Sequence, residues 1–599
     1  VTGGSQTGGG DRVLDRLKPF VYRRYLDYGV FESLRDMHAR IMSEVARRDR
    51  ADDVKLGPGG IREIEFLVQS LQIVRGGSIP DLKDPSLLTV VPRLVDARSL
   101  DAGAAERLLT AYRFHRRLEN AIQAIGDKQV HALPTAELDR ARLVLALGFD
   151  DWPSLVDEFE QRRSEVSAQF GTIAFPEASG EESDDDYGAL WVAAAAADEW
   201  RTALEAGGVG DAEAIAARLS EFRQLPVARK ADTLSRERLD AYVPRMLGLV
   251  AVLEEPGTAV DRRLRIVEQI LRRSAYLALL NENPLAARRL VALCERSEYI
   301  ANQIASHPVL LDELLDPRAV TGPLGKDEIR EDLGLALGRL DDRDPEAWME
   351  AVARAQRATL FRVAVADFGG DLPIMKVSDS LTHLAEVVLE ETLALAWNDL
   401  EARHGVPCYE VDGERHEAGF GIIGYGKLGG LELSYGSDLD IVFLHDSTGK
   451  RQQTNGDAPI DNAVFFTRLV RRIVHFLGTR TRTGVLYEVD TRLRPSGRKG
   501  LLVTSVDAFE RYQEENAWTW EHQALLRARP VAGSAAVAAE FTRIRRRTLE
   551  SLVRRDTLKE DVISMRGRMR NELDTSDTKT FDLKQGGGGI GDIEFLVQY

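Results

Sequence analysis

Hydrophobic side chains recur three and four positions apart through most of the chain before Gly405. This spacing places them on one face of an α-helix and predicts helical segments at 82–170 and 198–253. Short apolar runs broken by Asn-Pro and His-Pro pairs indicate several packed helices at 263–317. A long amphipathic helix is predicted to begin at Ser380, as its N-cap, and to end at Gly405, as its C-cap.

After this helix the pattern changes to apolar runs bounded by glycine and polar residues, which is typical of strands. Three strands are predicted, at GFGIIGYG (419–426), SDLDIVFLHD (437–446) and TGVLYEVDTRLRP (483–495). The chain is therefore expected to have a predominantly helical α+β fold.

One sequence pattern occurs twice. KLGPGGIREIEFLVQS (55–70) is nearly repeated as KQGGGGIGDIEFLVQY (584–599), and an Arg-rich helical region precedes each copy. The chain begins at Val1 and ends inside an apolar pattern. We therefore expect a fragment of a longer protein with two related domains, containing the tail of the first and most of the second. The acidic segment 176–188 has little apolar content and is predicted to be a disordered linker.

Length and composition restrict the class of protein. A chain of 599 residues is expected to hold three or four domains, and its net charge of −17 argues against a dominant nucleic-acid surface. Cys294 and Cys408 lie far apart, which fits a reducing cytoplasm without disulfides or a zinc site. The apolar run Ala189–Ala197 is too short to cross a bilayer, and no targeting pattern opens the chain. We expect a cytoplasmic protein with no nucleic-acid or membrane partner.

Two carboxylates stand at the start of the second predicted strand, in the sequence Gly-Ser-Asp-x-Asp. Asp438 and Asp440 are two residues apart, so both side chains project from one face of the strand. Neighbouring carboxylates repel each other, and a divalent cation between them favours the ionised pair. Mg²⁺ binds one or two carboxylates together with phosphate oxygens. Gly436 and Ser437 allow backbone N–H groups to approach such phosphates, and the segment predicts a nucleotidyltransferase site.

A two-metal site, with ions roughly 3.5–4 Å apart, needs a further ligand from elsewhere in the chain. Glu488 and Asp490 share one face of the third predicted strand. Asp490 is the favoured ligand, with an ion pair to a nearby arginine as its alternative role, and Glu488 is left open. Arg492 and Arg494 lie on the face of Asp490, where they either contact phosphates or neutralise the acids.

Gly424, Gly426 and Gly429 match the G-x-G-x-x-G fingerprint of dinucleotide-binding proteins. A Rossmann unit needs a full helix and about 30 residues, with an acid about 20 residues further on. Here the next strand begins near Ser437, so only a short helical turn fits, and the acids open that strand. We therefore predict a nucleotidyltransferase turn. The chain contains no G-x-x-x-x-G-K-[ST] loop for a P-loop.

Several of these segments resemble one known family, the bacterial glutamine synthetase adenylyltransferases. The resemblance is carried by 419–446, by 485–534, by the twin GGI-x-x-IEFLVQ repeats, and by RSAYLALLNENP and HPVLLDELLDP, and it covers nearly the whole chain. The family has two polymerase-β-like nucleotidyltransferase domains joined by a helical regulatory region. The resemblance implies a small mixed sheet of that type, flanked by helical bundles.

The resemblance also implies an activity. The second domain is expected to transfer AMP from ATP to a tyrosine of glutamine synthetase, with release of pyrophosphate, and so to regulate nitrogen assimilation. The first domain of the family removes AMP by phosphorolysis, and the PII signal protein and glutamine are the implied regulators. The phenol of tyrosine has a pKa of about 10, so a metal ion or a carboxylate base must activate it for in-line attack on the α-phosphorus.

Site residues follow by matching the family motifs to this sequence. Asp438, Asp440 and Asp490 are the expected catalytic and metal-binding residues, with Asp438 and Asp440 on both Mg²⁺ ions. Asp490 is assigned to the ion nearer the nucleophile and is also a candidate base. The expected nucleotide-binding residues are Gly424, Gly426, Gly429, Gly436, Ser437 and Arg492.

The first domain departs from the family because its own Asp pair is missing, so we expect no removal of AMP by this fragment. The segment GGGGIGDIEF either closes over the site or forms a flexible connection, and Asp592 and Glu594 are open candidates in it. The expected division is 1–175, the helical tail of the first domain; 176–190, the acidic linker; 191–260, a helical regulatory region; 261–535, the adenylylating domain; and 536–599, the start of its helical domain.

Two other functions are considered. A related nucleotidyltransferase that uridylylates a small signalling protein shares the Gly-Ser-Asp-x-Asp core. It is expected to carry a His/Asp phosphohydrolase domain too, whereas the doublet His445-Asp446 ends the catalytic strand itself. The other alternative is a non-catalytic helical scaffold, which would keep its partner binding after replacement of Asp438 by Asn.

Overall fold

The structure is a computed structural model, and the chain in it divides into two compact units, Val1–Pro317 and Arg318–Tyr599. These units are defined by contacts within the chain, whereas the five segments predicted from the sequence are defined by their expected roles. The boundaries of those five segments therefore stay a prediction. The residues that the structure describes are 53–77, 79–97, 99–174, 184–315, 322–338, 344–481, 484–552 and 557–599, together with Val13, Leu17, Lys18, Val21 and Tyr22.

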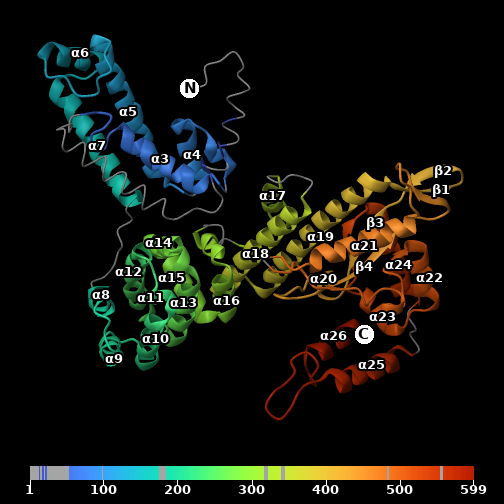
Figure 1. Ribbon diagram of the computed structural model, residues 1–599. Coiled ribbons are helices and arrows are strands. Elements are labelled where there is room, and N and C mark those ends of the chain that lie inside the picture. The colour runs from blue at the N-terminus through green and yellow to red at the C-terminus, as the bar shows by residue number, and fades with distance from the viewer. Residues whose placement is uncertain are drawn as a thin grey trace. The chain divides into compact units, whose positions relative to one another are not determined.

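The first unit is helical in its described part (Figure 1). In α5 (Ala102–Gly126), Asp101 caps the N-terminus by accepting the N–H of Ala104 at 3.0 Å. The buried residues of α5 recur three and four positions apart and pack against α3, α4 and α7. The helices are α3 (Ile61–Arg75), η1 (Pro80–Lys83), α4 (Leu87–Asp96), α5, α6 (Glu137–Leu147), α7 (Trp152–Ala174), α8 (Asp184–Val192), α9 (Ala197–Ala206), α10 (Ala212–Gln224), α11 (Pro226–Arg229), α12 (Thr233–Val250), α13 (Pro256–Ile270), η2 (Leu271–Arg273), α14 (Ala275–Glu282), α15 (Pro284–Arg296), α16 (Glu298–Ser306) and η3 (Pro308–Leu315).

The structure describes only the end of the predicted disordered linker 176–188. Residues 176–183 lie outside the described residues. From residue 184 the prediction is wrong, because the chain forms α8 there. Tyr187 and Trp191 of this helix are buried, and the Trp191 indole donates to Asp240 of α12 at 2.7 Å. Burial of two aromatic side chains therefore outweighs the acidic composition.

The long helix α19 (Ile374–His404) begins earlier than its sequence predicts. Its N-cap position is Pro373, so the assignment of Ser380 as the N-cap is wrong. Ser380 is fully buried, and its hydroxyl accepts the N–H of Leu324 at 3.1 Å. A serine whose hydroxyl is satisfied by another segment does not need to end a helix. The predicted C-cap is confirmed, since Gly405 has a φ of +79°.

The second unit contains two small sheets, and the mostly helical α+β prediction is confirmed (Figure 1). A five-stranded sheet has the order β6-β4-β3-β8, with β7 also paired to β4. β3 is antiparallel to β4 and β8, whereas β6 and β7 are parallel to β4. A three-stranded antiparallel sheet has the order β2-β1-β5. The strands are β1 (Pro407–Val411), β2 (Glu414–Glu417), β3 (Phe420–Gly424), β4 (Leu439–His445), β5 (Lys450–Thr454), β6 (Val489–Asp490), β7 (Val503–Ser505) and β8 (Arg529–Gly533).

Both faces of the five-stranded sheet are buried. Ile441 and Phe443 of β4 pack into one core with α19 and α21, whereas Val442 and Leu444 pack into a second core with α22 and α24. A strand buried on both faces reads as a continuous apolar run, as β4 does. The helices of this unit are α17 (Lys326–Leu337), α18 (Pro345–Gly369), α19, α20 (Gly426–Gly429), α21 (Asn462–Gly478), η5 (Gly497–Lys499), α22 (Val506–Glu515), α23 (Thr519–Leu525), α24 (Ala535–Arg547), η6 (Thr548–Leu552), α25 (Leu558–Leu573) and α26 (Ile590–Gln598).

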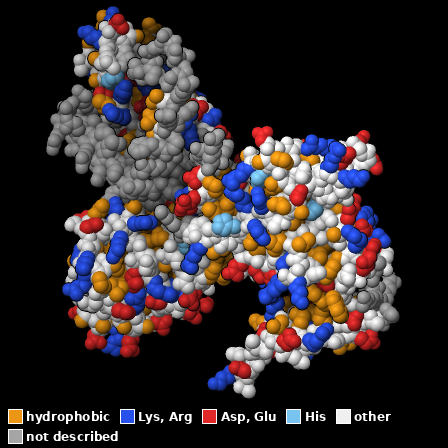
Figure 2. Space-filling model, turned by 45° about the vertical axis from the view of Figure 1, so that its right-hand side comes forward, with side chains coloured by type: hydrophobic (Ala, Val, Ile, Leu, Met, Phe, Trp, Pro, Cys, Tyr) orange, Lys and Arg blue, Asp and Glu red, His pale blue; other side chains and the backbone are white. Residues whose placement is uncertain are grey.

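Basic and acidic side chains are interspersed on the face of the molecule drawn in Figure 2. Among the described residues, no helix is both long enough and apolar enough to cross a membrane.

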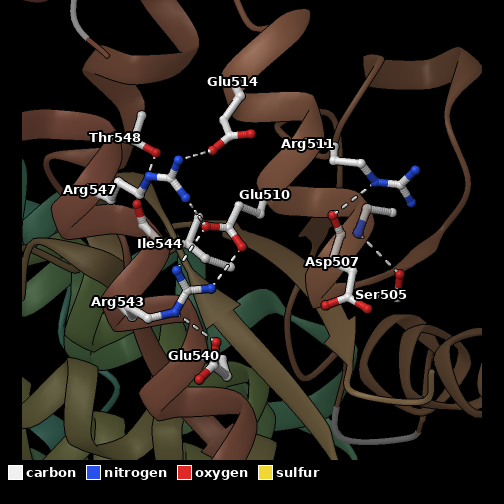
Figure 3. A network of polar contacts seen from close by, with 11 residues as sticks. Ser505, Asp507, Glu510, Arg511, Glu514, Glu540, Arg543, Ile544, Arg547 and Thr548 are labelled. Carbon is white, nitrogen blue, oxygen red and sulfur yellow. Dashed lines mark hydrogen bonds and ion pairs between the residues drawn. The ribbon is translucent and has the colours of Figure 1, made fainter. Parts of the chain in front are cut away.

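A group of ion pairs joins α22 to α24 beside the second core (Figure 3). Glu510 of α22 accepts from both terminal nitrogens of Arg543, at 2.8 and 2.7 Å, and from Arg547 at 2.9 Å. Arg547 also pairs with Glu514 at 2.7 Å. The hydrogen bonds from Arg543 hold the pKa of the Glu510 carboxyl below its ordinary value. This carboxylate therefore stabilises the packing of the two helices.

We expect Glu510→Gln to lower the free energy of unfolding by about 1–2 kcal/mol, because two arginines lose one charged acceptor. Glu540 pairs with the same Arg543 on an exposed helix surface, so Glu540→Gln is the matched control and is expected to cost about 0.5 kcal/mol or less. Because the pKa of Glu510 is lowered by folding, its contribution is present above pH about 4.3 and is lost as the pH falls further. Thermal melting from pH 7 to 3 measures this, and equal shifts for both variants at pH 7 would contradict it.

Candidate active site

The sheet brings the two predicted acidic segments together. Asp438 directly precedes β4 and Asp440 is its second residue. β6 lies parallel to β4, with Asp440 opposite Asp490, and Leu439 donates its N–H to the Glu488 carbonyl at 2.8 Å. The predicted third strand is shorter than expected. It consists of residues 489–490, which pair with Leu439 and Asp440 of β4.

Three carboxylates meet at this edge of the sheet. One oxygen from each of Asp438, Asp440 and Asp490 lies within 4.8 Å of the others. Within the described part of the chain they form the one group of three or more potential metal ligands at this spacing. Glu488 is exposed and lies outside the group. Oxygen ligands from two neighbouring strands suit Mg²⁺, so the residues present fit the predicted metal centre.

The electrostatics of the group also fit a cation. Burial, followed by the neighbouring carboxylates of Asp438 and Asp490, raises the pKa of Asp440 to about 6, against the opposing effect of Arg492 and Lys584. The hydrogen bond from Arg492 instead lowers the pKa of Asp490. The protein thus brings more negative charge together than its own side chains neutralise, which is the condition under which a divalent cation is favoured.

The glycine-rich turn packs directly against these acids. Gly426 has a φ of +52°, and a Cβ there would lie 2.4 Å from an Asp440 carboxylate oxygen. The preceding residue, Tyr425, donates its N–H to the Asp440 carbonyl at 2.8 Å. The helical segment after it, α20, has four residues, so the short turn expected in place of a Rossmann helix is confirmed. Glycine is required at position 426 both by its φ and by the space that Asp440 occupies.

The loop before Asp438 forms a second turn. Gly436 has a φ of +69° with open space around its Cβ position. The Ser437 N–H donates to the Ser434 carbonyl at 3.1 Å, and the Ser437 hydroxyl accepts the Ser434 N–H at 3.1 Å. Lys427 of α20 donates to the Ser434 hydroxyl at 3.2 Å. The two glycine-containing turns are therefore linked, and the Ser437 N–H is used within its own loop.

The two candidate arginines have different environments. Arg492 is 63% exposed at its side chain and pairs with Asp490, with its Nε at 2.6 Å from the carboxylate. This contact is the neutralising role left open above, and nucleotide binding by Arg492 stays a prediction. Arg494 is buried and donates to the carbonyls of Thr491, at 2.8 Å, and Gly500, at 3.3 Å. Arg494 therefore stabilises the loop after β6.

Two arginines that sequence reasoning missed hold the glycine-rich turn from the other side. Arg529 of β8 donates to the carbonyls of Gly429 and Leu428 at 3.1 Å each and pairs with Glu386 of α19. The Arg527 carbonyl lies where a Cβ on Gly429 would stand, 1.7 Å away. The available signal was the alternation of two arginines at the start of a strand in LLRARPVAG.

The open candidates in GGGGIGDIEF are engaged in ion pairs. Asp592 pairs with Arg566 of α25 at 2.7 Å and with Arg570 at 2.6 Å. Glu594 pairs with Arg527 at 2.7 Å. Both acids therefore fix the start of α26 rather than joining the acidic group.

The two residues of the His-Asp doublet, His445 and Asp446, make contacts that stabilise the fold. His445 is half-buried and stacks on Phe466, with ring centroids 4.6 Å apart, and desolvation lowers its pKa to about 4. Asp446 accepts the N–H of Gly419 at 2.6 Å. Both residues secure the end of β4, and neither belongs to the metal-ligand group of the described residues.

Comparison with known proteins adds independent information. Residues 287–544 match the family model described as glutamate-ammonia ligase adenylyltransferase, and residues 35–174 match the model described as GlnD PII-uridylyltransferase. The first of these segments contains β3, β4 and β6, and therefore the acidic group.

Full-length relatives are similar along nearly the whole chain. The bifunctional glutamine synthetase adenylyltransferase/adenylyl-removing enzyme of Thioalkalivibrio sulfidiphilus is 47% identical over 98% of this chain and 62% of its own length. The proteins of that name from Pseudomonas syringae pv. tomato and Pseudomonas aeruginosa are each 44% identical over 100% of this chain and 63% of their own lengths. The chain thus spans less than two thirds of these relatives. With the acidic group and glycine-rich turn in place, these matches show that the chain is similar, over nearly its whole length, to bifunctional glutamine synthetase adenylyltransferase/adenylyl-removing enzymes.

Proposed function

We propose that this chain transfers AMP from ATP to a tyrosine of glutamine synthetase, with release of pyrophosphate. The observation that carries the proposal is the group of Asp438, Asp440 and Asp490 beside a glycine-rich turn. The names of the relatives supply the acceptor protein. In this reaction the phenolic oxygen forms a bond to the α-phosphorus as the bond to the pyrophosphate oxygen breaks.

We further propose that the sheet has the polymerase-β-like nucleotidyltransferase fold. Support comes from two acids at the start of β4, a third on the parallel neighbour β6, and helices on both faces. The adenylylating domain spans 261–535 in this proposal. The segments 191–260 and 536–599 are assigned to the helical regulatory region and to the start of the following helical domain.

Two Mg²⁺ ions are the proposed cofactors, held by Asp438 and Asp440 together, with Asp490 on one of them. When bound, such ions neutralise phosphate charge and lower the pKa of a coordinated hydroxyl. Burial and the two other carboxylates raise the pKa of Asp440 to about 6, so at pH 7 this side chain is mainly ionised and ready to bind a cation. Loss of ligand strength is expected below that pH, because protons compete for the same oxygens.

The protein's own residues then position the nucleotide. The proposed nucleotide-binding residues are Gly424, Gly426 and Gly429 of the first turn and Gly436 and Ser437 of the second. The space around the Cβ position of Gly436 is open, so the backbone there can approach a phosphate without side-chain obstruction. Each turn lies beside the acids, so the reacting phosphate and the carboxylates are held in one place.

Asp490 is the proposed base for the phenol proton. A tyrosine with a pKa of about 10 is protonated at neutral pH, and a carboxylate near the attacking oxygen accepts that proton. Arg492 pairs with Asp490 and keeps it ionised. We propose that the same arginine also contacts the nucleotide.

The remaining assignments concern the whole protein. We propose that the full-length protein also removes AMP, the activity that the name of its relatives states, and that it does so by phosphorolysis. Among the described residues, Asp438, Asp440 and Asp490 are the one group of three potential metal ligands within 4.8 Å of one another. We therefore assign adenylylation to this group. A cytoplasmic location and regulation by the PII signal protein and glutamine complete the proposal.

Incubation of the chain with Mg²⁺ and glutamine synthetase tests the function. Label from α-labelled ATP is expected on a synthetase tyrosine, whereas γ-labelled ATP is expected to give none, because pyrophosphate leaves. α-Labelled UTP with PII protein serves as the uridylylation control. Absence of label on glutamine synthetase, from this chain and from a longer form of the protein, would contradict the proposal.

A further inference from the structure

The two copies of the glycine-rich repeat form the same turn. In the first copy the Asp53 carboxylate accepts the N–H of Lys55 at 2.9 Å. In the second copy the Asp582 carboxylate accepts the N–H of Lys584 at 2.9 Å. Each carboxylate also accepts the next N–H along the chain, at 2.8 and 2.9 Å. An aspartate two residues before the lysine thus fixes the lysine backbone in both copies.

The same lysines are tied to the helix that follows. The Lys55 carbonyl accepts the N–H of Arg62 in α3 at 3.1 Å, and the Lys584 carbonyl accepts the N–H of Gly591 in α26 at 2.9 Å. Both contacts join positions seven residues apart. The repeat is therefore a structural unit that presents a lysine beside the N-terminus of a helix.

An acid in the first turn of each helix closes the unit. Glu63 accepts the N–H of Gly59 at 2.8 Å, and Asp592 accepts the N–H of Gly588 at 2.6 Å. Both glycines have positive φ, +70° and +81°. The second copy is held further by Arg566, which donates to Asp592 at 2.7 Å. The turn that carries Lys584 is therefore well fixed on α25 and α26.

This second copy is attached to the acidic site by one arginine. The Arg527 guanidinium pairs with Glu594 of α26 at 2.7 Å and, through its other terminal nitrogen, with Glu432. Glu432 belongs to the loop between α20 and Asp438, and the Arg527 carbonyl packs on Gly429 of α20. The lysine unit and the glycine-rich turn are thus held by the same residue.

Lys584 carries a positive charge that no described acid neutralises in an ion pair. In the first copy the corresponding Lys55 lies 3.6 Å from Glu119, a carboxylate that also pairs with Arg116. Lys584 is exposed and, within the described ranges, forms no ion pair or hydrogen bond through its ammonium. It is close enough to Asp440 to act on that carboxyl electrostatically. Its charge is therefore available to a ligand.

We propose that Lys584 binds phosphate oxygens of the ATP held at the acidic site. The inference rests on the proposed function and extends the site to the second glycine-rich repeat. Three carboxylates and a triphosphate together carry more negative charge than two divalent cations offset, and Arg492 is already paired with Asp490. An ammonium on a fixed turn supplies the missing positive charge, since fixed cations stabilise phosphoryl groups at low reorganisation cost.

Binding of MgATP to the 599-residue chain is the direct test. Lys584→Gln is expected to weaken binding about tenfold to a hundredfold, as expected for loss of one charged contact. Lys584→Arg keeps the charge and is expected to retain most of the affinity. Lys579→Gln removes an exposed lysine from the same segment and is the matched control, with unchanged affinity. Thermal melting is expected to be equal for all of these variants.

The outcomes separate the inference from the function beneath it. If Asp440→Asn weakens MgATP binding while Lys584→Gln binds like the unsubstituted chain, the role of Lys584 is overturned and the proposed function stands. Equal losses for Lys584→Gln and Lys579→Gln would also overturn it, because a general charge effect would then explain both. If the unsubstituted chain binds no MgATP, the inference and the proposed function fall together.

Discussion

Replacement of Asp440 by asparagine is expected to lower AMP transfer by a factor on the order of 10³ or more, while the folded protein becomes slightly more stable. The loss follows because Asp440, like Asp438, is a proposed ligand of both metal ions, and bound ions supply several kcal/mol of charge stabilisation. The gain follows because burial, together with Asp438 and Asp490, raises the pKa of Asp440 to about 6. An acid whose pKa is raised by folding costs stability above that pH, by about 1–2 kcal/mol here.

Transfer of label from α-labelled ATP and thermal melting without added metal measure the two effects. Glu488→Gln is the matched control, since Glu488 is exposed, adjacent in sequence to the site, and outside the acidic group. It is expected to leave both quantities unchanged. Loss of activity accompanied by a lower melting temperature in Asp440→Asn would indicate a structural role and would contradict the assignment.

Replacement of Gly429 by alanine is expected to destabilise the second unit by about 2–3 kcal/mol. The added Cβ would lie 1.7 Å from the Arg527 carbonyl oxygen and 2.6 Å from the Gly424 carbonyl oxygen. Both neighbours are backbone atoms, so relief requires a shift of α20 or of the segment that leads into β8. Such a shift moves the turn against Asp440, and AMP transfer is expected to fall as well.

Denaturant unfolding of the two variants Gly429→Ala and Gly478→Ala provides the measurement. Gly478 ends α21 with no atom within 4 Å of its Cβ position, so alanine there is expected to be neutral or to add about 0.5 kcal/mol. If both variants unfolded at the same denaturant concentration, close packing at Gly429 would not be the reason for glycine there.

Much of the fold was predictable from local patterns. The three-and-four spacing predicted the helices, and the apolar runs after Gly405 predicted β3 and β4. The errors at Ser380 and at residues 184–188 share one cause. In each place a contact with a distant segment satisfies a polar group: the Ser380 hydroxyl bonds to Leu324, and the Trp191 indole of α8 bonds to Asp240 of α12. Sequence patterns describe the local preference and do not contain the contact.

The candidate site divides in the same way. The two-residue spacing of Asp438 and Asp440 and the short gap after Gly429 were visible because they are local features of one strand and one turn. Glu488 and Asp490 were equally visible as acids, yet only pairing of β6 with β4 brings Asp490 to the group and leaves Glu488 outside. Register across a sheet depends on residues far apart in sequence, so the sequence alone could not distinguish Asp490 from Glu488 as the metal ligand.

By itself, the sequence determined the chemistry of this protein: an Asp pair opening a buried strand, glycines that form a short turn, and a repeated glycine-rich segment. Only the tertiary structure decided which distant groups complete it. Arg527 joins the loop after α20 to α26, and the turn that precedes α26 carries Lys584. These contacts span 67 residues or more along the chain. They form because ion pairs and sheet pairing act through space, and the entropic cost of closing the intervening chain grows only slowly with its length.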